Sequence, residues 1–411
     1  MTKFWTAVFN RRMLICIFTG IASGMPLFLI VQLIPAWLRF EGVGLAEIGF
    51  FALIGLPYTW KFAWAPLLDR YCINSFGRRR TWMLFTQLAL IISISFLPQL
   101  STDTQLWSIA YLSAIVAFFS ATQDIAIDAY RREILPDEEL GLGNSVFVTA
   151  YRVSVLVPGS LGLILSDHIA WELVFPIVAI FMMIGVITTC LISEPEGIQN
   201  KPQSLKEAVV TPFKEFFARS GWKSAIFILL FIFLYKLGDN LATALSTPFY
   251  IDLGFSGTEI GIVAKHAALW PSIFGGILGG LLMIKIGINR ALWAFGVVQI
   301  LSILGFAILA KAGGGLTLLA IVIAFEYLGV GLGTAAIVAF MAREASKAHS
   351  ATQLALFTAL AALPRTVANA STGLIVESIG WENFFYLCTL CAIPGMLLLI
   401  KVAPWTNSET A

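Results

Sequence analysis

The chain alternates between long apolar runs and short polar breaks along its 411 residues. A helix needs about 20 apolar residues to cross a hydrocarbon core about 30 Å thick, and most of these runs are that long. The runs are continuous rather than alternating, which excludes the strands of a membrane barrel. We predict an all-α integral membrane protein with twelve transmembrane helices, near residues 13–38, 46–68, 81–99, 106–130, 141–166, 172–192, 222–250, 258–285, 291–310, 316–341, 352–376 and 383–402.

Lysine and arginine are unevenly distributed over the predicted loops. With both termini in the cytoplasm, nineteen of them fall on the cytoplasmic side and only Arg39 and Lys311 on the other side. Five more fall within predicted spans. Cytoplasmic loops of membrane proteins carry an excess of basic residues. The pattern therefore predicts a multi-pass protein with an even number of spans and both termini in the cytoplasm.

The second half of the sequence repeats short motifs of the first half at an offset of 210 to 212 residues. The matches keep one order: Gly42–Gly49 with Gly254–Gly261, Arg132-Glu133 with Arg343-Glu344, Gly162-Leu-Ile with Gly373-Leu-Ile, and Trp171-Glu172 with Trp381-Glu382. Four matches at nearly one spacing indicate a duplication. Because the offset covers six helices, both copies have the same orientation, as in the major facilitator superfamily. We expect two pseudo-symmetric six-helix bundles.

A polar stretch, Ser193–Gly221, separates the two halves. Ser204-Leu-Lys-Glu207 within it resembles a capping box, and apolar residues follow at helical spacing. We expect an amphipathic helix on the cytoplasmic membrane surface, although a plain linker is the alternative. The predicted organisation is a bundle over 1–193, a linker over 194–221 and a second bundle over 222–411.

Composition narrows the class of protein further. Hydrophobic residues make up 58% and charged residues 12%, against about 25% charged residues in a soluble domain. This excludes a soluble enzyme. A net charge of +2 gives no reason to expect a nucleic-acid partner. Five cysteines indicate no disulfide framework, and Cys388 and Cys391 lie in an apolar helix without further ligands, so we expect no metal and no cofactor. We also expect the first helix to remain in the mature protein.

Several motifs point to one family. They are Ala22-Ser-Gly24-Met-Pro26, Asp69-Arg70-Tyr71, Gly77-Arg78-Arg79-Arg80, Ala121-Thr-Gln-Asp124, Leu135-Pro136, Tyr151-Arg152 and Pro364-Arg365. The chain resembles the muropeptide permease (AmpG) family of the major facilitator superfamily over nearly its whole length. The match around Asp124 is the most specific.

The resemblance implies a transporter of the bacterial inner membrane that serves peptidoglycan recycling. It implies import of GlcNAc-1,6-anhydroMurNAc and its peptides from periplasm to cytoplasm, by alternating access and coupled to protons. In some bacteria such import feeds the signals that induce β-lactamase. We expect a monomer in the lipid bilayer. Gating is expected at Gly24 of the first helix, in the loop after the second helix at Asp69, Arg70 and Arg78, and after the fourth helix at Arg132.

Four acidic residues lie within predicted spans beyond the first turn, where a charge costs several kcal/mol on most scales. They are Asp124, Asp128, Asp239 and Glu326, on the fourth, seventh and tenth helices. These helices line the central cavity by family analogy. Asp124 and Asp128 are four residues apart and share one helix face, so we predict proton coupling there. For Asp128 the alternative is a gating or structural ion pair with Arg132.

Basic and amide side chains at mid-depth are candidates for substrate binding. Arg152 and Arg365 could each neutralise a buried acid or bind a substrate carboxylate. Lys236 and Asp239 are three apart and could pair with one another. Amides can bind sugar hydroxyls or join two helices. The predicted substrate-binding set is Gln32, Gln123, Arg152, Lys236, Asp239, Asn240, Glu326 and Arg365.

Three other functions compete with this prediction. The nearest is a proton symporter of another polar metabolite, such as a sugar, a peptide or an acyl-CoA-like molecule. A membrane enzyme would show clustered histidines, cysteines or carboxylates, but the three histidines fall in unrelated segments. An ATP-driven pump would carry G-x-x-x-x-G-K-[ST], which the sequence lacks. Secondary transport is the prediction.

Overall fold

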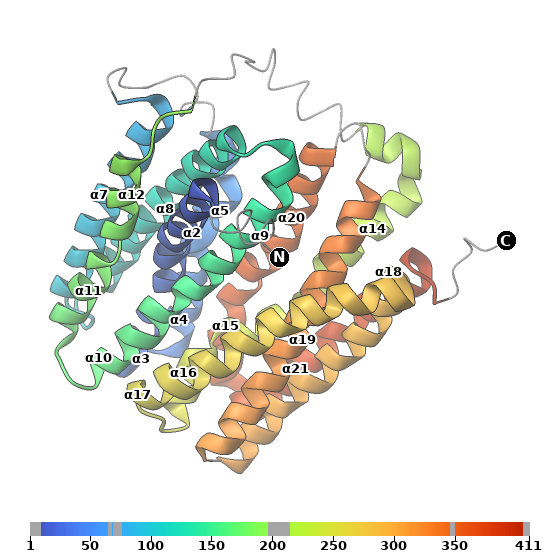
Figure 1. Ribbon diagram of the computed structural model, residues 1–411. Coiled ribbons are helices and arrows are strands. Elements are labelled where there is room, and N and C mark those ends of the chain that lie inside the picture. Colours follow the sequence, from blue (N-terminus) through green and yellow to red (C-terminus); the bar gives the residue numbers. More distant parts are fainter. Residues whose placement is uncertain are drawn as a thin grey trace. The chain divides into compact units, whose positions relative to one another are not determined.

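The computed structural model describes residues 10–64, 68, 76–195, 214–313, 315–345 and 350–405. Every regular element in these ranges is helical (Figure 1). The helices form two compact units, and the boundaries cut across the order of the sequence. Unit 1 contains residues 1–44, 53–199 and 250–265, and unit 2 contains residues 45–52, 200–249 and 266–411.

Unit 1 is built around α2, which packs against α9 and α8. Its helices are α2 (Arg11–Phe28), α3 (Ile34–Phe40), α5 (Leu56–Trp60), α7 (Arg78–Phe96), α8 (Leu106–Ile134), α9 (Asp137–Val153), α10 (Gly162–Ser166), α11 (Trp171–Ile180), α12 (Met183–Leu191) and α17 (Gly257–Glu259). Short π-helical turns interrupt them at η1 (Leu29–Leu33), η6 (Val157–Leu161) and η7 (Ile260–Ala264).

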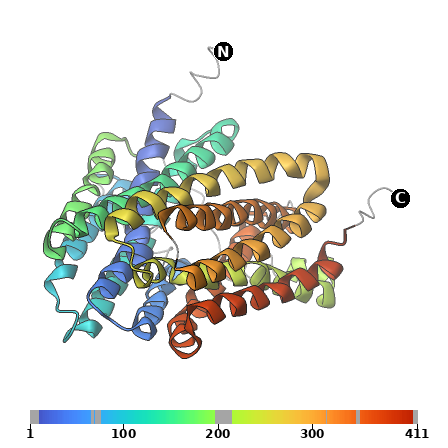
Figure 2. The ribbon, with the colours of Figure 1, turned by 90° about the horizontal axis from the view of Figure 1, so that it is seen from below.

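Unit 2 holds most of the second half of the chain. Its helices are α4 (Leu45–Phe50), α14 (Trp222–Tyr235), α15 (Leu237–Ala244), α19 (Leu316–Glu344), α20 (Ser350–Val367) and α21 (Thr372–Val402), with most of α18 (Lys265–Ala312) and the start of α16 (Ser246–Asp252). Figure 2 shows α18 turning back on itself, at Gly287. Gly287 has a φ of 78°, a left-handed conformation that glycine tolerates best.

The structure does not confirm the predicted number of twelve membrane spans. Within the described ranges, ten helical stretches are long and apolar enough to cross a membrane. The predicted span 46–68 corresponds to a shorter helical stretch, Leu45–Trp60, which turns of 3-10 helix interrupt. The last two predicted spans fall in one stretch, Phe357–Val402, with a left-handed break at Gly380.

Large apolar side chains are exposed along these helices, as a lipid-facing surface requires. Trp107 is 77% exposed and Leu191 is 73% exposed. The buried core of unit 1 gathers around Met83, Ile127 and Tyr130, and that of unit 2 around Phe231 and Phe340. The apolar surface supports a membrane-embedded protein.

Most of the linker predicted over 194–221 lies outside the described residues. Residues 214–220 are helical, and Phe216 is buried in the core of unit 2. Part of the predicted linker therefore packs against a bundle. The proposed boundaries at 193 and 222 stay a prediction, because the two compact units also exchange short segments.

Candidate functional site

Asp124 lies midway along α8 and faces α2. Ser23 of α2 donates a hydrogen bond of 2.5 Å to its Oδ1. The two helices can meet closely here because Gln123, the residue before Asp124, donates from Nε2 to the Ala22 carbonyl at 2.8 Å. The carboxylate of Asp124 is therefore held by a hydroxyl, with no ion pair among the described residues.

Asp128 has a different environment one turn away on the same helix. Its carboxylate pairs with Arg131 at 2.9 Å and with Lys61 at 3.9 Å, and its side chain is 47% exposed. Arg131 also stacks over the Phe147 ring. Sequence reasoning proposed Arg132 as the partner of Asp128; the structure gives Arg131 and Lys61. The two acids thus differ: Asp128 forms ion pairs with two cations, and Asp124 forms none in the described part of the chain.

Arg152 is half-buried in α9, and both roles left open for it above stay predictions. Asp124 bonds to Ser23, not to Arg152. Among the described residues, Arg152 makes no hydrogen bond or ion pair. A cation at this depth without a protein partner is chemically suited to a substrate carboxylate. Arg365 in α20 is exposed and likewise has no ion-pair partner within the described ranges.

Amide side chains occupy both units. Gln32 lies in the π-helical turn η1, a feature frequent at functional sites. Its Oε1 is buried and accepts no hydrogen bond in the described part of the chain, and a Cβ at Gly159 would lie 2.5 Å from it. Gln123 has a helix-to-helix bond through Nε2, but its Oε1 has no such partner. Asn240 is half-buried in α15.

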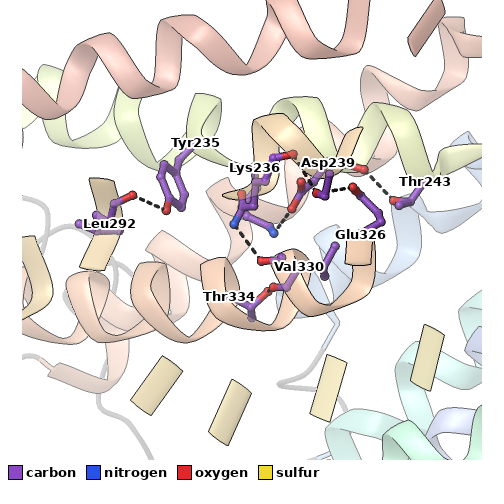
Figure 3. Close-up of polar contacts among 11 residues, drawn as sticks. Tyr235, Lys236, Asp239, Thr243, Leu292, Glu326, Val330 and Thr334 are labelled. Carbon is purple, nitrogen blue, oxygen red and sulfur yellow. Dashed lines mark hydrogen bonds and ion pairs between the residues drawn. The ribbon is translucent and has the colours of Figure 1, made fainter. Parts of the chain in front are cut away.

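A second polar cluster lies in unit 2, between α14, α15, α18 and α19 (Figure 3). Lys236 forms an ion pair with Asp239, three residues away, as the spacing allowed. Ser302 of α18 donates to Oε2 of Glu326 at 2.6 Å. Glu326 is 0% exposed and Asp239 is 3% exposed. In this structure the two carboxylates are buried from solvent. Their role in substrate binding therefore stays a prediction.

The basic signature after the second span is tied to acids inside unit 1. Arg79 pairs with Glu133 at 2.8 Å, and Arg78 approaches the same carboxylate at 3.5 Å. The backbone N–H groups of Arg79 and Arg80 donate to Glu194 at the start of α7. Asp69 and Arg70 lie outside the described residues, and the roles of Arg78 and Arg132 in gating stay predictions.

Gly24 is explained by packing. A Cβ added there would lie 2.3 Å from Ser154 Oγ and 2.5 Å from the Tyr151 carbonyl, so only glycine lets α2 contact α9. Whether Gly24 also flexes during transport stays a prediction.

Sequence reasoning missed the partners of these charges. Ser23, Ser302 and Glu194 were not singled out, because a serine or a loop glutamate carries no pattern of its own. For metals, no group of three or more His, Cys, Asp or Glu side chains comes together in the described ranges. Cys388 and Cys391 have free thiols.

Comparison with known proteins identifies the family. The major facilitator superfamily profile matches residues 58–368. The anhydromuropeptide permease of Escherichia coli (strain K12) is 39% identical over 403 residues, which cover 97% of this chain and 82% of the relative. The putative transporter AmpG 4 of Rickettsia felis is 32% identical and covers 98% of this chain and 99% of the relative. The chain belongs to the muropeptide permease (AmpG) family.

Solved structures agree on the fold of this AmpG-family member. The nucleoside transporter NupG has a TM-score of 0.75 at 14% identity and covers 96% of this chain and 99% of its own. A D-xylose-proton symporter has a TM-score of 0.72 at 16% identity, covering 97% and 99%. The protein is a multi-span membrane transporter of the major facilitator fold and not an enzyme.

Proposed function

We propose that this protein imports anhydromuropeptides, GlcNAc-1,6-anhydroMurNAc and its peptides, from the periplasm to the cytoplasm by proton-coupled alternating access. It acts as a monomer in the bacterial inner membrane with both termini in the cytoplasm. The E. coli relative, named for anhydromuropeptides, supports the substrate class. The observation that carries proton coupling is Asp124, an intramembrane acid held by a serine hydroxyl.

The difference between Asp124 and Asp128 supports one proton site rather than two. Lys61 and Arg131 lie beside the Asp128 carboxylate and balance its charge. Asp124 has a hydrogen bond from Ser23 and forms no ion pair within the described ranges, so its charged form is the more expensive of the two in a membrane interior. Ser23 can donate to the carboxylate, and it can equally accept a bond from the protonated carboxyl group. Asp124 therefore binds and releases the transported proton, and Asp128 anchors the nearby cations.

The proposed substrate contacts are polar side-chain atoms that have no partner within the described residues. The stem peptide of a muropeptide carries carboxylates, for which the Arg152 guanidinium offers a bidentate fork. The sugars carry hydroxyl and N-acetyl groups, which the free Oε1 atoms of Gln32 and Gln123 can accept hydrogen bonds from. We assign Arg152 to the peptide carboxylate and these amides to the sugars.

Uptake of labelled anhydromuropeptide into proteoliposomes tests the proposal. We expect accumulation when the outside is more acidic than the inside, and its loss in Asp124→Asn. Asp103→Asn, at an exposed acid in a loop, is the matched control and should keep full uptake. Accumulation that ignores both the gradient and Asp124→Asn would contradict coupling. If labelled anhydromuropeptide does not accumulate in the parent protein, the substrate is another polar metabolite.

A further inference from the structure

The motifs that recur in the two halves of the sequence meet in the structure. Within unit 2, the start of α4 packs on the start of α21, where a Cβ at Gly49 would lie 2.9 Å from the Gly373 nitrogen. Within unit 1, η7 packs on η6, where a Cβ at Gly261 would lie 2.8 Å from the Ser160 carbonyl. Each contact joins a first-half segment to a second-half segment. The duplication thus produces the same contact twice.

Each contact also has a carboxylate at a helix start. Asp167 accepts hydrogen bonds from the backbone N–H groups of Gly257 at 3.1 Å and Thr258 at 2.6 Å. Glu377 accepts one from the Ala46 N–H at 2.9 Å. Asp167 and Glu377 are 210 residues apart, which is the repeat offset. A carboxylate stabilises the first turn of a helix by satisfying free N–H groups and by its favourable charge.

The two contacts are reinforced differently. The contact in unit 1 carries a bond from Ser160 Oγ to the Gly261 carbonyl at 2.7 Å, and unit 1 also holds an ion pair between Arg39 of α3 and Asp252 of α16 at 2.5 Å. In the unit 2 contact the backbones of α4 and α21 approach each other closely, since a Cβ at Gly373 would lie 1.8 Å from the Leu45 carbonyl. With both termini in the cytoplasm, all four contacting segments fall at the periplasmic ends of their spans.

We propose that Asp167 and Glu377 are paired outer-gate residues: each carboxylate holds a helix start of the opposite half, and both contacts break when the transporter opens to the periplasm. This rests on the alternating access of the proposed function. The two residues do not contact the substrate; they position the helices that control its entry. The carboxylates of Asp167 and Glu377 are exposed, so water can replace their hydrogen bonds when the contacts break and re-form in each cycle.

The first test measures opening without any substrate. Leu45 is 6% exposed, so in a cysteine-free background Leu45→Cys reacts with an impermeant maleimide only when the unit 2 contact opens. We expect labelling to rise about threefold in Asp167→Asn or Glu377→Gln and about tenfold in both together. Glu382→Gln, at a partly exposed acid of α21, is the matched control and should not change labelling. Unchanged labelling in the double variant would overturn the proposal.

The second test locks one contact. Asp167 lies beside Thr258, so His168→Cys and Thr258→Cys can be joined by a short bifunctional thiosulfonate without removing the backbone hydrogen bonds to Asp167. We expect cross-linking to abolish uptake and reduction to restore it, and labelling of Leu45→Cys to fall to background. Full transport by cross-linked protein would overturn the proposal. If even the unlocked protein takes up no anhydromuropeptide, the proposed substrate fails, while the labelling still tests the gate.

A third variant separates the gate from general stability. Gly373→Ala should prevent closure of the unit 2 contact and raise the labelling of Leu45→Cys about tenfold, since its Cβ meets backbone. Gly280→Ala, whose Cβ would meet nothing within 4 Å, should leave labelling unchanged. Equal labelling in the two alanine variants would count against the gate.

Discussion

Two acids within helices, one in each unit, have similar hydrogen-bond partners but different exposure to solvent. Asp124 and Glu326 both accept a hydrogen bond from a serine of a neighbouring helix, Ser23 and Ser302. Glu326 is sealed at 0% exposure beside the Lys236–Asp239 ion pair, whereas Asp124 lies one turn from a half-exposed Asp128. A residue that carries protons must exchange them with water, so the access of water to each carboxylate distinguishes the two acids. The difference supports the proposal of coupling at Asp124, and the predicted role of the Glu326 cluster in substrate binding remains to be tested.

The largest expected effect is on coupling. Asp124→Asn removes the only group that we expect to carry the proton, so gradient-driven accumulation should fall about 100-fold, as loss of general acid–base groups does elsewhere. Glu326→Gln keeps the shape and most of the hydrogen bond from Ser302, and it should retain uptake within a few-fold. Uptake assays on both variants check the comparison, and the reverse ranking would break it.

The next effect is on stability. Lys236→Ala leaves the buried Asp239 carboxylate without its cation, which should lower the free energy of unfolding by about 3–5 kcal/mol. The double variant Lys236→Ala/Asp239→Ala should recover most of that loss. Thermal unfolding in detergent measures both. If the single variant is as stable as the parent, the ion pair does not organise unit 2.

A smaller effect is expected on substrate affinity. Arg152→Ala should raise the KM for peptide-bearing muropeptides about 10-fold to 100-fold, the cost of losing a charged hydrogen bond. It should change the KM for the peptide-free sugar little, because that molecule lacks the stem carboxylates. Competition assays with the two ligands make the distinction. Equal losses for both would contradict the assignment of Arg152.

The smallest effect should come from Ser23→Ala. The hydroxyl contributes one hydrogen bond, worth about 1–3 kcal/mol to a charged partner, so transport should slow several-fold without losing its dependence on the gradient. Thr19→Ala, whose hydroxyl bonds only within α2, is the control and should be near the parent. Full loss of coupling in Ser23→Ala would mean that the serine itself relays the proton.

The helical fold could be predicted because a bilayer demands long apolar helices, and hydropathy records that demand directly. The span near 46–68 was harder to predict from the sequence, because Pro57 and the turns of 3-10 helix shorten its α-helical part. The Lys236–Asp239 pair followed from helical spacing. The Ser23–Asp124 and Ser302–Glu326 bonds did not, because they join different helices and depend on packing that a single sequence does not display. The outer contacts were visible only as repeated motifs without a stated role.

Proton movement itself is the most direct test of the central claim that Asp124 carries the coupled proton. Adding unlabelled anhydromuropeptide to weakly buffered proteoliposomes should make the outside medium more alkaline as protons enter with substrate. The account predicts this signal in the parent protein and in Asp103→Asn, and no signal in Asp124→Asn. A substrate-dependent alkaline shift of normal size in Asp124→Asn would contradict it.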